Sequence, residues 1–404
     1  MGSSHSSTID CRTDVKTSAT EFQYSGLDVT KCDSMTYPSF NRVSRRAVLG
    51  AGLFTGTSLL LKACGGNPSS VSANGSADAG AIGGRLIAAC FAGSWEQFYR
   101  DVLVPAFVEV TGGEVNLTPM VSLEQVAQLT AAAQNPPFDV ALLDEGPFNA
   151  APRDELFEKL PVDLVDNYAE VLPELQNPDG WGPTTGVQVM GIAYNPTIVS
   201  TPPTSWEDLW DSQYRGRVSM QGMQTTQGTS LMVQIAKMNG GSETDIEPAF
   251  AALQELKPNL AGIASNAGAL ATLFQQEEVV IAPHDLNNVM ALKARGAEID
   301  WVMPQEGGIA LRPAQQIVKN TSADLELAAA FINAALSTEV QTAMAAEPYY
   351  FVPSNRNVAL TGILEEKLGS NSAKVLDKLV LLDWNEINKN RTAWIERFDR
   401  EVQV

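Results

Sequence analysis

Small and polar residues stand directly after the predicted buried strands, where a strand gives way to a loop or a helix. They are Ser94, Trp95, Ser122, Asp144, Glu145, Thr225, Thr226, His284 and Asp285. In open parallel sheets, ligands bind beyond the carboxyl ends of the strands, where loops and helix N-termini converge. Hydroxyls, an indole, carboxylates and free backbone N–H groups at such positions hold small polar molecules. The pattern therefore predicts a cleft for a small polar solute between two lobes.

Each of these positions also has a structural interpretation, which the sequence leaves open. The serines and threonines can act as helix caps alone. The two carboxylates precede Gly146 and Pro147, which also suits a solvated turn. The histidine can be a hydrogen-bonded structural residue, and the tryptophan can pack in the core.

Catalytic and metal chemistry have little support in the residues. Beyond Cys64 the chain has one cysteine, Cys90, and one histidine, His284. This excludes Cys/His and multi-histidine zinc sites, and neither G-x-S-x-G nor a P-loop is present. We expect no enzyme activity, no cofactor and no metal, although a Ser–His–Asp set that uses His284 stays open. Cys90 lies in an apolar run and is predicted to be a buried structural thiol without a disulfide partner.

The elements that must position the polar residues follow from the hydrophobic pattern. Residues 85–91, 114–120 and 138–143 are predicted strands, and the helices that alternate with them begin near Ser94 and Ser122. This alternation predicts a parallel α/β sheet. Further strands are expected at 187–194, 217–220, 279–282 and 299–303. A capping box at 204–207 and the pair at 225–226 open helices, and more helices are expected at 325–336, 340–346 and 374–404.

The size of the folded part predicts two lobes. Residues 85–404 are more than one hydrophobic core usually serves. We assign about 85–183 and 286–312 to lobe 1. Lobe 2 is assigned about 184–285 and 313–404.

Residues 1–64 are predicted to be an N-terminal extension that ends in an export signal. Arg45-Arg46 precedes the apolar run 47–61, which is too short to span a bilayer as a helix, and Ala63-Cys64 follows. The pattern is typical of a twin-arginine signal with Cys64 as a lipidation site. Cleavage near 77–79, no cleavage, and a start at Met35 instead of Met1 stay open. Residues 65–84, rich in Gly and Ser, are a predicted flexible tether.

The charge balance excludes some partners. Residues 1–64 hold seven of the 27 basic and five of the 47 acidic residues, so the remainder has a net charge of about −22. Such a surface disfavours nucleic acid and anionic membranes as partners.

Several segments resemble the type II solute-binding proteins of ABC transporters, in the spermidine/putrescine-binding branch. The matching segments are 190–195, 203–211, 214–218, 304–308 and 381–384. The resemblance implies two α/β lobes that close on one solute like a Venus flytrap. It also places Ser94, Trp95, Asp144, Glu145, Thr226 and Asp285 in the cleft.

Two departures from this branch bear on the solute. Polyamine binders usually have a tryptophan after the strand at 279–282, where this chain has Pro283-His284-Asp285. After Gly307-Gly308 they carry an aromatic and an acidic residue, whereas Arg312 follows here. An arginine would repel an ammonium group but clamp a carboxylate or a phosphonate. A surface or interlobe salt bridge is the alternative for Arg312.

The resemblance implies a monomeric periplasmic protein that captures an amine-bearing, polyamine-like solute and delivers it to the permease subunits of an ABC importer. Membrane attachment would come from the N-terminal lipid or signal. A zwitterionic or anionic solute such as an amino acid, an opine or an aminophosphonate is an alternative. Ferric iron is another, because Tyr349 and Tyr350 are adjacent. Tyr350 is expected to border the cleft.

Overall fold

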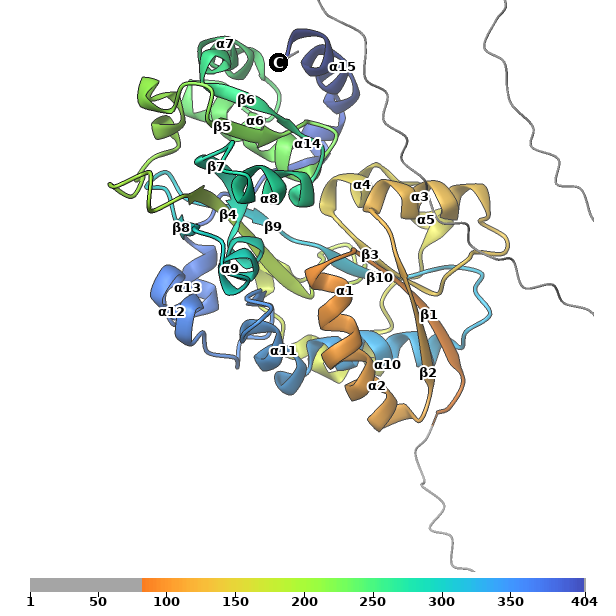
Figure 1. Cartoon of the computed structure of the whole chain (residues 1–404). Coiled ribbons are helices and arrows are strands. Elements are labelled where there is room, and N and C mark those ends of the chain that lie inside the picture. The colour runs from red at the N-terminus through yellow and green to blue at the C-terminus, as the bar shows by residue number, and fades with distance from the viewer. Residues whose placement is uncertain (1–81, 403–404) are drawn as a thin grey trace, which may run out of the picture. The chain divides into compact units, whose positions relative to one another are not determined.

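The computed structural model describes residues 82–402, which form two β-sheets flanked by helices (Figure 1). The expected α/β class is confirmed. The predicted export signal, the Cys64 lipidation site and most of the predicted tether lie outside the described residues. None of the helices within 82–402 is both long and apolar enough to cross a membrane.

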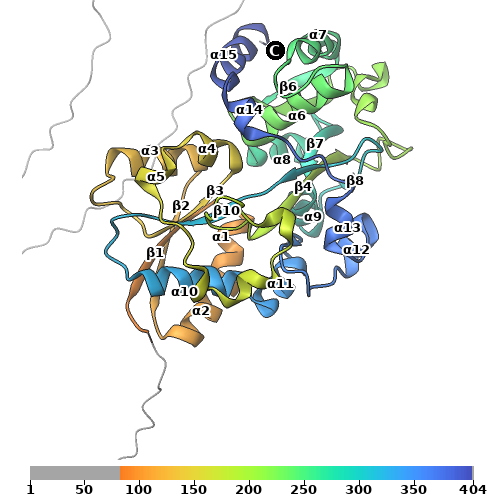
Figure 2. The ribbon, with the colours of Figure 1, turned by 180° about the vertical axis from the view of Figure 1, so that it is seen from behind.

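The first sheet has the strand order β10-β3-β1-β2, and β1 runs parallel to both of its neighbours. Its strands are β1 (Arg85–Cys90), β2 (Glu114–Pro119), β3 (Val140–Leu143) and the antiparallel β10 (Ala314–Ile317). A helical run of α1 (Ser94–Phe98), a π-helical turn (Tyr99–Leu103) and α2 (Val104–Thr111) follows β1. The other helices of this part are α3 (Ser122–Ala131), α4 (Glu145–Ala150), α5 (Arg153–Leu156) and α10 (Leu325–Leu336). Helices α3 and α4 lie on one side of the sheet, and α2 and α10 lie on the other (Figures 1 and 2).

The second sheet is built around the long buried strand β4 (Gly186–Tyr194) in the order β11-β4-β7-β5-β6. The other strands are β5 (Val218–Gln221), β6 (Leu260–Ala264), β7 (Ile281–Asp285), β8 (Asp300–Val302), β9 (Ile309–Leu311) and β11 (Val352–Pro353). Strands β8 and β9 pair with β4. The helices of this part include α6 (Thr226–Met238), α7 (Glu247–Leu256), α8 (Ala267–Gln275), α9 (Leu286–Ala294), α11 (Thr338–Ala345) and α12 (Gly362–Leu368).

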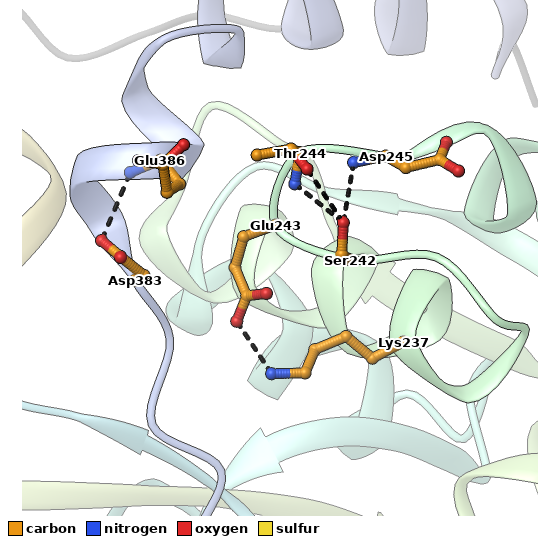
Figure 3. Close-up of polar contacts among 7 residues, drawn as sticks. All are labelled: Lys237, Ser242, Glu243, Thr244, Asp245, Asp383 and Glu386. Atoms are coloured by element: carbon orange, nitrogen blue, oxygen red, sulfur yellow. Dashed lines mark hydrogen bonds and ion pairs between the residues drawn. The ribbon is translucent and has the colours of Figure 1, made fainter.

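The C-terminal segment differs from the single amphipathic helix that the sequence predicts at 374–404. It contains three helices, α13 (Ser372–Leu376), α14 (Trp384–Asn388) and α15 (Arg391–Glu401). Asp383 accepts hydrogen bonds from the backbone N–H groups of Asn385 and Glu386, so it caps α14 and starts a new helix there. The bond from Glu386 is drawn in Figure 3. Figure 3 also shows the turn after α6, where Lys237 pairs with Glu243 at 2.8 Å.

The chain crosses between the two sheets just before β4 and again between β9 and β10, and these two crossing segments form hydrogen bonds with each other. The backbone N–H of Thr185 donates to the carbonyl of Pro313 at 3.3 Å, and that of Gln315 donates to Pro183 at 3.2 Å. The Gln316 side-chain amide both accepts from the N–H of Gly182 and donates to its carbonyl. The crossings therefore form a hydrogen-bonded double connection between the two lobes.

Strand pairing corrects the expected division of the late chain between the lobes. Residues 286–312 were assigned to lobe 1, yet β8 and β9 pair with β4 in the second sheet. Residues 313–404 were assigned to lobe 2, yet β10 pairs with β3 in the first sheet and α10 packs beside it. The second crossing carries the chain back to the first sheet, and hydrophobic periodicity does not reveal the direction of such a crossing. The helices α14 and α15 do pack with the second sheet, in the core that contains Trp384 and Phe398.

The hydrophobic core runs through the junction of the lobes. One cluster joins Trp95 and Phe98 of the first part to Val187 and Val189 of β4, and Phe351 is stacked on Trp95 with ring centroids 4.3 Å apart. Cys90 is fully buried in this cluster, and burial raises its pKa to about 12, as expected for a structural thiol. Rings packed on β4 therefore brace the elements that carry the candidate residues.

Gly182 allows close approach of the two crossings, and its substitution tests their importance. A Cβ atom at position 182 would lie 1.7 Å from the carbonyl oxygen of Gln315. We expect Gly182→Ala to lower the free energy of unfolding by about 2 kcal/mol or more, because the backbone must move apart. The control is Gly262→Ala, since a Cβ there meets nothing within 4 Å. Equal melting temperatures for the two variants would contradict this account.

Candidate ligand-binding cleft

A cleft of about 1210 Å³ opens between the two sheets. Residues after β1, β2 and β3 form one wall, and residues after β5, β6 and β7 form the other. The predicted site residues that line it are Ser94, Trp95, Ser122, Asp144, Thr225, Thr226 and His284. Four others do not line it, namely Glu145, Asp285, Arg312 and Tyr350. The rule that polar residues follow strand ends thus brings most of the candidates together.

Asp144 links the two walls. Its backbone N–H donates to the Ser122 hydroxyl at 2.9 Å, and its carboxylate accepts from the Thr226 hydroxyl at 2.8 Å. Burial raises the pKa of Asp144, whereas the hydroxyls and the Arg391 guanidinium lower it. Ser122 is therefore not a side-chain cap of α3, and Thr225 is the residue that caps α6.

Trp95, Gln188 and Asn287 form the floor of the cleft and are joined by a chain of hydrogen bonds in which each side chain donates to the next. The Trp95 indole N–H donates to the Gln188 side-chain oxygen at 3.1 Å. The Gln188 amide nitrogen in turn donates to the Asn287 side-chain oxygen at 3.3 Å. Because an indole only donates, it fixes the orientation of the Gln188 amide.

His284 and Asp285 belong to strand β7, whereas the sequence places them in the loop after it. Both side chains are fully buried. Burial lowers the pKa of His284 to about 4, which keeps the imidazole neutral at neutral pH. The Asp285 carboxylate accepts from Gln227 at 3.2 Å and from Asn288 at 3.1 Å. Asp285 therefore holds neighbouring elements together instead of lining the cleft.

Glu145 and Arg312 bind each other outside the cleft. The Arg312 guanidinium makes a bidentate contact with the Glu145 carboxylate, at 3.0 Å from Nε and 2.5 Å from Nη2. Arg312 stands between β9 and β10, so the pair ties a crossing to α4 of the first lobe. Burial raises the pKa of Glu145 to about 7 despite the opposing effect of Arg312. The structure thus forms the salt bridge that the sequence offers as the alternative for Arg312, and a clamp on the solute gains no support from this geometry.

The adjacent tyrosines do not converge on one site. Tyr349 lines the cleft, but its hydroxyl donates to the Asp101 carboxylate at 3.1 Å, and burial together with Asp101 raises its pKa to about 12. Tyr350 does not line the cleft. Within the described residues, no group of three or more His, Cys, Asp and Glu side chains is arranged to hold a metal ion. The ferric-iron alternative therefore gains no support from the geometry.

Sequence reasoning missed several residues of the cleft. They include Gln188, Gln221, Asn287, Arg295 and Arg391. Arg391 begins α15, and its guanidinium is held by the Thr229 hydroxyl at 3.1 Å and the Gln224 carbonyl at 3.2 Å. No local pattern connects it with Asp144, which lies far away in the sequence. Gln221 and Asn287, in contrast, stand at a strand end and a helix start, so the rule used for the other residues also fits them.

Comparisons with known proteins agree with this architecture. Residues 135–390 match the family model of bacterial extracellular solute-binding proteins. A Salmonella typhimurium periplasmic protein named for 2-aminoethylphosphonate binding is 28% identical over 215 residues, which cover 52% of this chain and 58% of that protein. The norspermidine sensor of Vibrio cholerae is 26% identical over 180 residues, covering 41% of this chain and 47% of the sensor. The chain thus spans about half the length of these relatives.

A crystal structure of an ABC transporter protein from Clostridium perfringens superimposes with a TM-score of 0.66 at 25% identity. It covers 79% of this chain and 100% of that one. The chain belongs to the family of bacterial extracellular solute-binding proteins. The two-lobed type II fold is confirmed. The spermidine/putrescine branch, the twin-arginine signal and the lipid anchor stay predictions.

The pKa of Asp285 gives a test of the buried strand end. Burial raises it to about 6, so the folded protein keeps a proton that the unfolded chain releases above about pH 4. Wild-type stability therefore falls as the pH rises from about 4 to 6. Asp285→Asn has no such proton, and we expect its stability relative to wild type to increase by about 2 kcal/mol over this range. Thermal unfolding at several pH values measures this difference, with the exposed Asp163→Asn as control. A difference that does not change with pH would contradict the assignment.

Proposed function

We propose that this protein captures a small zwitterion, with an amine at one end and an acidic oxyanion at the other, and delivers it to an ABC permease. The class that fits best is the aminophosphonates. Capture requires no chemistry on the solute, only closure of the two walls around it.

The proposal rests on the charged side chains that line the cleft. Within residues 82–402, the lining includes one carboxylate, Asp144, and two guanidinium groups, Arg295 and Arg391. The whole chain has a net charge of −20, so the cleft is less acidic than the protein around it. A polyamine carries several ammonium groups, and each one needs a carboxylate or an aromatic partner. One carboxylate suits a single amine, and the guanidinium groups add positive potential that favours an acidic group in the cleft.

Helix starts add positive potential to the same walls. The first turns of α3, α6, α8 and α9 contribute residues to the lining. The N-terminus of a helix carries a partial positive charge, which favours an anion beside it. The Asp144 carboxylate is the complementary group, and it is the residue available to an amine.

The relatives support the same class. The longer match is to the protein named for 2-aminoethylphosphonate, and the shorter match is to the norspermidine sensor. 2-Aminoethylphosphonate combines an ammonium group and a phosphonate on a two-carbon chain, and these charges complement the carboxylate and the guanidinium groups of the cleft. The polyamine-like solute that the sequence suggests is the second candidate, and the sensor is the observation that favours it.

Calorimetric titration of the purified protein tests the proposal. We expect 2-aminoethylphosphonate to bind with a micromolar Kd, or about −8 kcal/mol. Putrescine lacks the acid and ethylphosphonate lacks the amine. We expect each to bind at least about 10-fold more weakly, because one charged group of the cleft then has no partner. Tighter binding of putrescine or norspermidine than of the aminophosphonate would contradict the proposal.

A further inference from the structure

Three side chains that line the cleft each hold a buried nitrogen without a hydrogen-bond partner in the described residues. The atoms are Gln221 Nε2, His284 Nε2 and Asn287 Nδ2. The side chains are 4%, 0% and 2% exposed. Leaving a buried polar group unpaired costs about 1–3 kcal/mol, which a ligand that accepts hydrogen bonds from these nitrogens would recover.

The His284 nitrogen is a donor. The backbone N–H of Asp285 donates to His284 Nδ1 at 3.0 Å, so Nδ1 is the acceptor of the ring. In a neutral imidazole the proton is then on Nε2. The carbonyl of His284 also accepts from the Trp301 indole at 3.0 Å, which holds this strand end in place.

The Asn287 nitrogen is oriented by the hydrogen-bond chain from Trp95. Gln188 accepts from the indole and therefore presents its NH₂ group to the Asn287 oxygen. The Asn287 oxygen is thereby used, and the NH₂ group is the part that stays unpaired. Trp95 is thus a positioning residue for Asn287.

The third donor comes from a different element. Gln221 is the last residue of β5, whereas His284 belongs to β7 and Asn287 to the first turn of α9. A ligand that satisfies all three must supply acceptors toward several directions. A phosphonate has three terminal oxygens and only accepts when it is fully ionised, whereas an ammonium group offers donors alone.

We propose that Gln221, His284 and Asn287 form the subsite for the phosphonate head of the solute. This inference rests on the proposed function, since it assigns one end of the zwitterion to one part of the cleft. Asp144 on the opposite wall then faces the amine. A bound solute with this orientation bridges both walls, and its charges favour the closed arrangement.

Reversing the polarity of single donors tests the subsite. Asn287→Asp and Gln221→Glu keep the size of the side chain but replace an NH₂ group by a carboxylate oxygen. We expect each to weaken 2-aminoethylphosphonate binding by about 100-fold or more in calorimetric titrations. The matched control is Asn371→Asp, which adds the same charge at an exposed position outside the cleft lining. Asn371 caps α13 through its side-chain oxygen, and Asp keeps that cap, so we expect a loss below about 2-fold.

Asn287→Ala is the second variant if Asn287→Asp unfolds, and we expect it to lose about 10-fold in affinity. It also tests the positioning role. Trp95→Phe removes the indole N–H, and we expect about a 10-fold loss in wild type but less than about 2-fold in the Asn287→Ala background. Losses that multiply would contradict positioning through Asn287.

The outcomes separate the subsite from the proposed function. If wild type binds 2-aminoethylphosphonate and Asn287→Asp binds it as well as Asn371→Asp does, the subsite is wrong while the proposed function stands. If wild type binds β-alanine or taurine more tightly, the head group is a carboxylate or a sulfonate and the phosphonate assignment is overturned. If wild type binds only amines without an acidic group, both proposals fail.

Discussion

The indole N–H of Trp95 can only donate a hydrogen bond, and this constraint sets the orientation of the amide side chains on the floor of the cleft. It fixes the orientation of the Gln188 amide, which in turn fixes the orientation of the Asn287 amide. The series of hydrogen bonds ends at the Asn287 NH₂ group, which has no partner in the described residues. His284 also presents an unpaired donor, Nε2, because the Asp285 N–H occupies its acceptor nitrogen Nδ1. Donors that are set in advance cost little reorganisation when a ligand arrives, so the cleft favours an acceptor before any solute enters.

The same elements that orient the donors also join the lobes. Gln188 belongs to β4, which begins at the first crossing, and Arg312 stands at the second. The Thr226–Asp144 hydrogen bond connects the two walls, and the Arg312–Glu145 pair ties the second crossing to α4 outside the cleft. Asp144 thus has two roles in our account, because the carboxylate that bridges the walls is also the partner of the amine. Closure and solute capture are coupled through this residue.

Local sequence patterns predicted most of the strands and the class of fold, because buried runs and the polar residues after them are readable. They failed where long-range pairing decides the structure. The chain returns to the first sheet at Pro313, so β9 and β10 on either side of it belong to the opposite lobes from those predicted. Asp285 belongs to β7 because it pairs with Met190 of β4. For Arg312 the sequence leaves a solute clamp and a salt bridge open, and the folded chain forms the salt bridge with Glu145. Arg391 reaches the cleft from the last helix, a proximity that only the folded chain creates.

A crystal structure of the protein with 2-aminoethylphosphonate would test the orientation of the donors most directly. Our account predicts that the phosphonate oxygens lie within about 3 Å of His284 Nε2 and Asn287 Nδ2, with the ammonium group at the Asp144 carboxylate. A complex with the solute reversed, so that the ammonium group faces His284 and Asn287, would contradict the claim that this floor is built to receive an oxyanion.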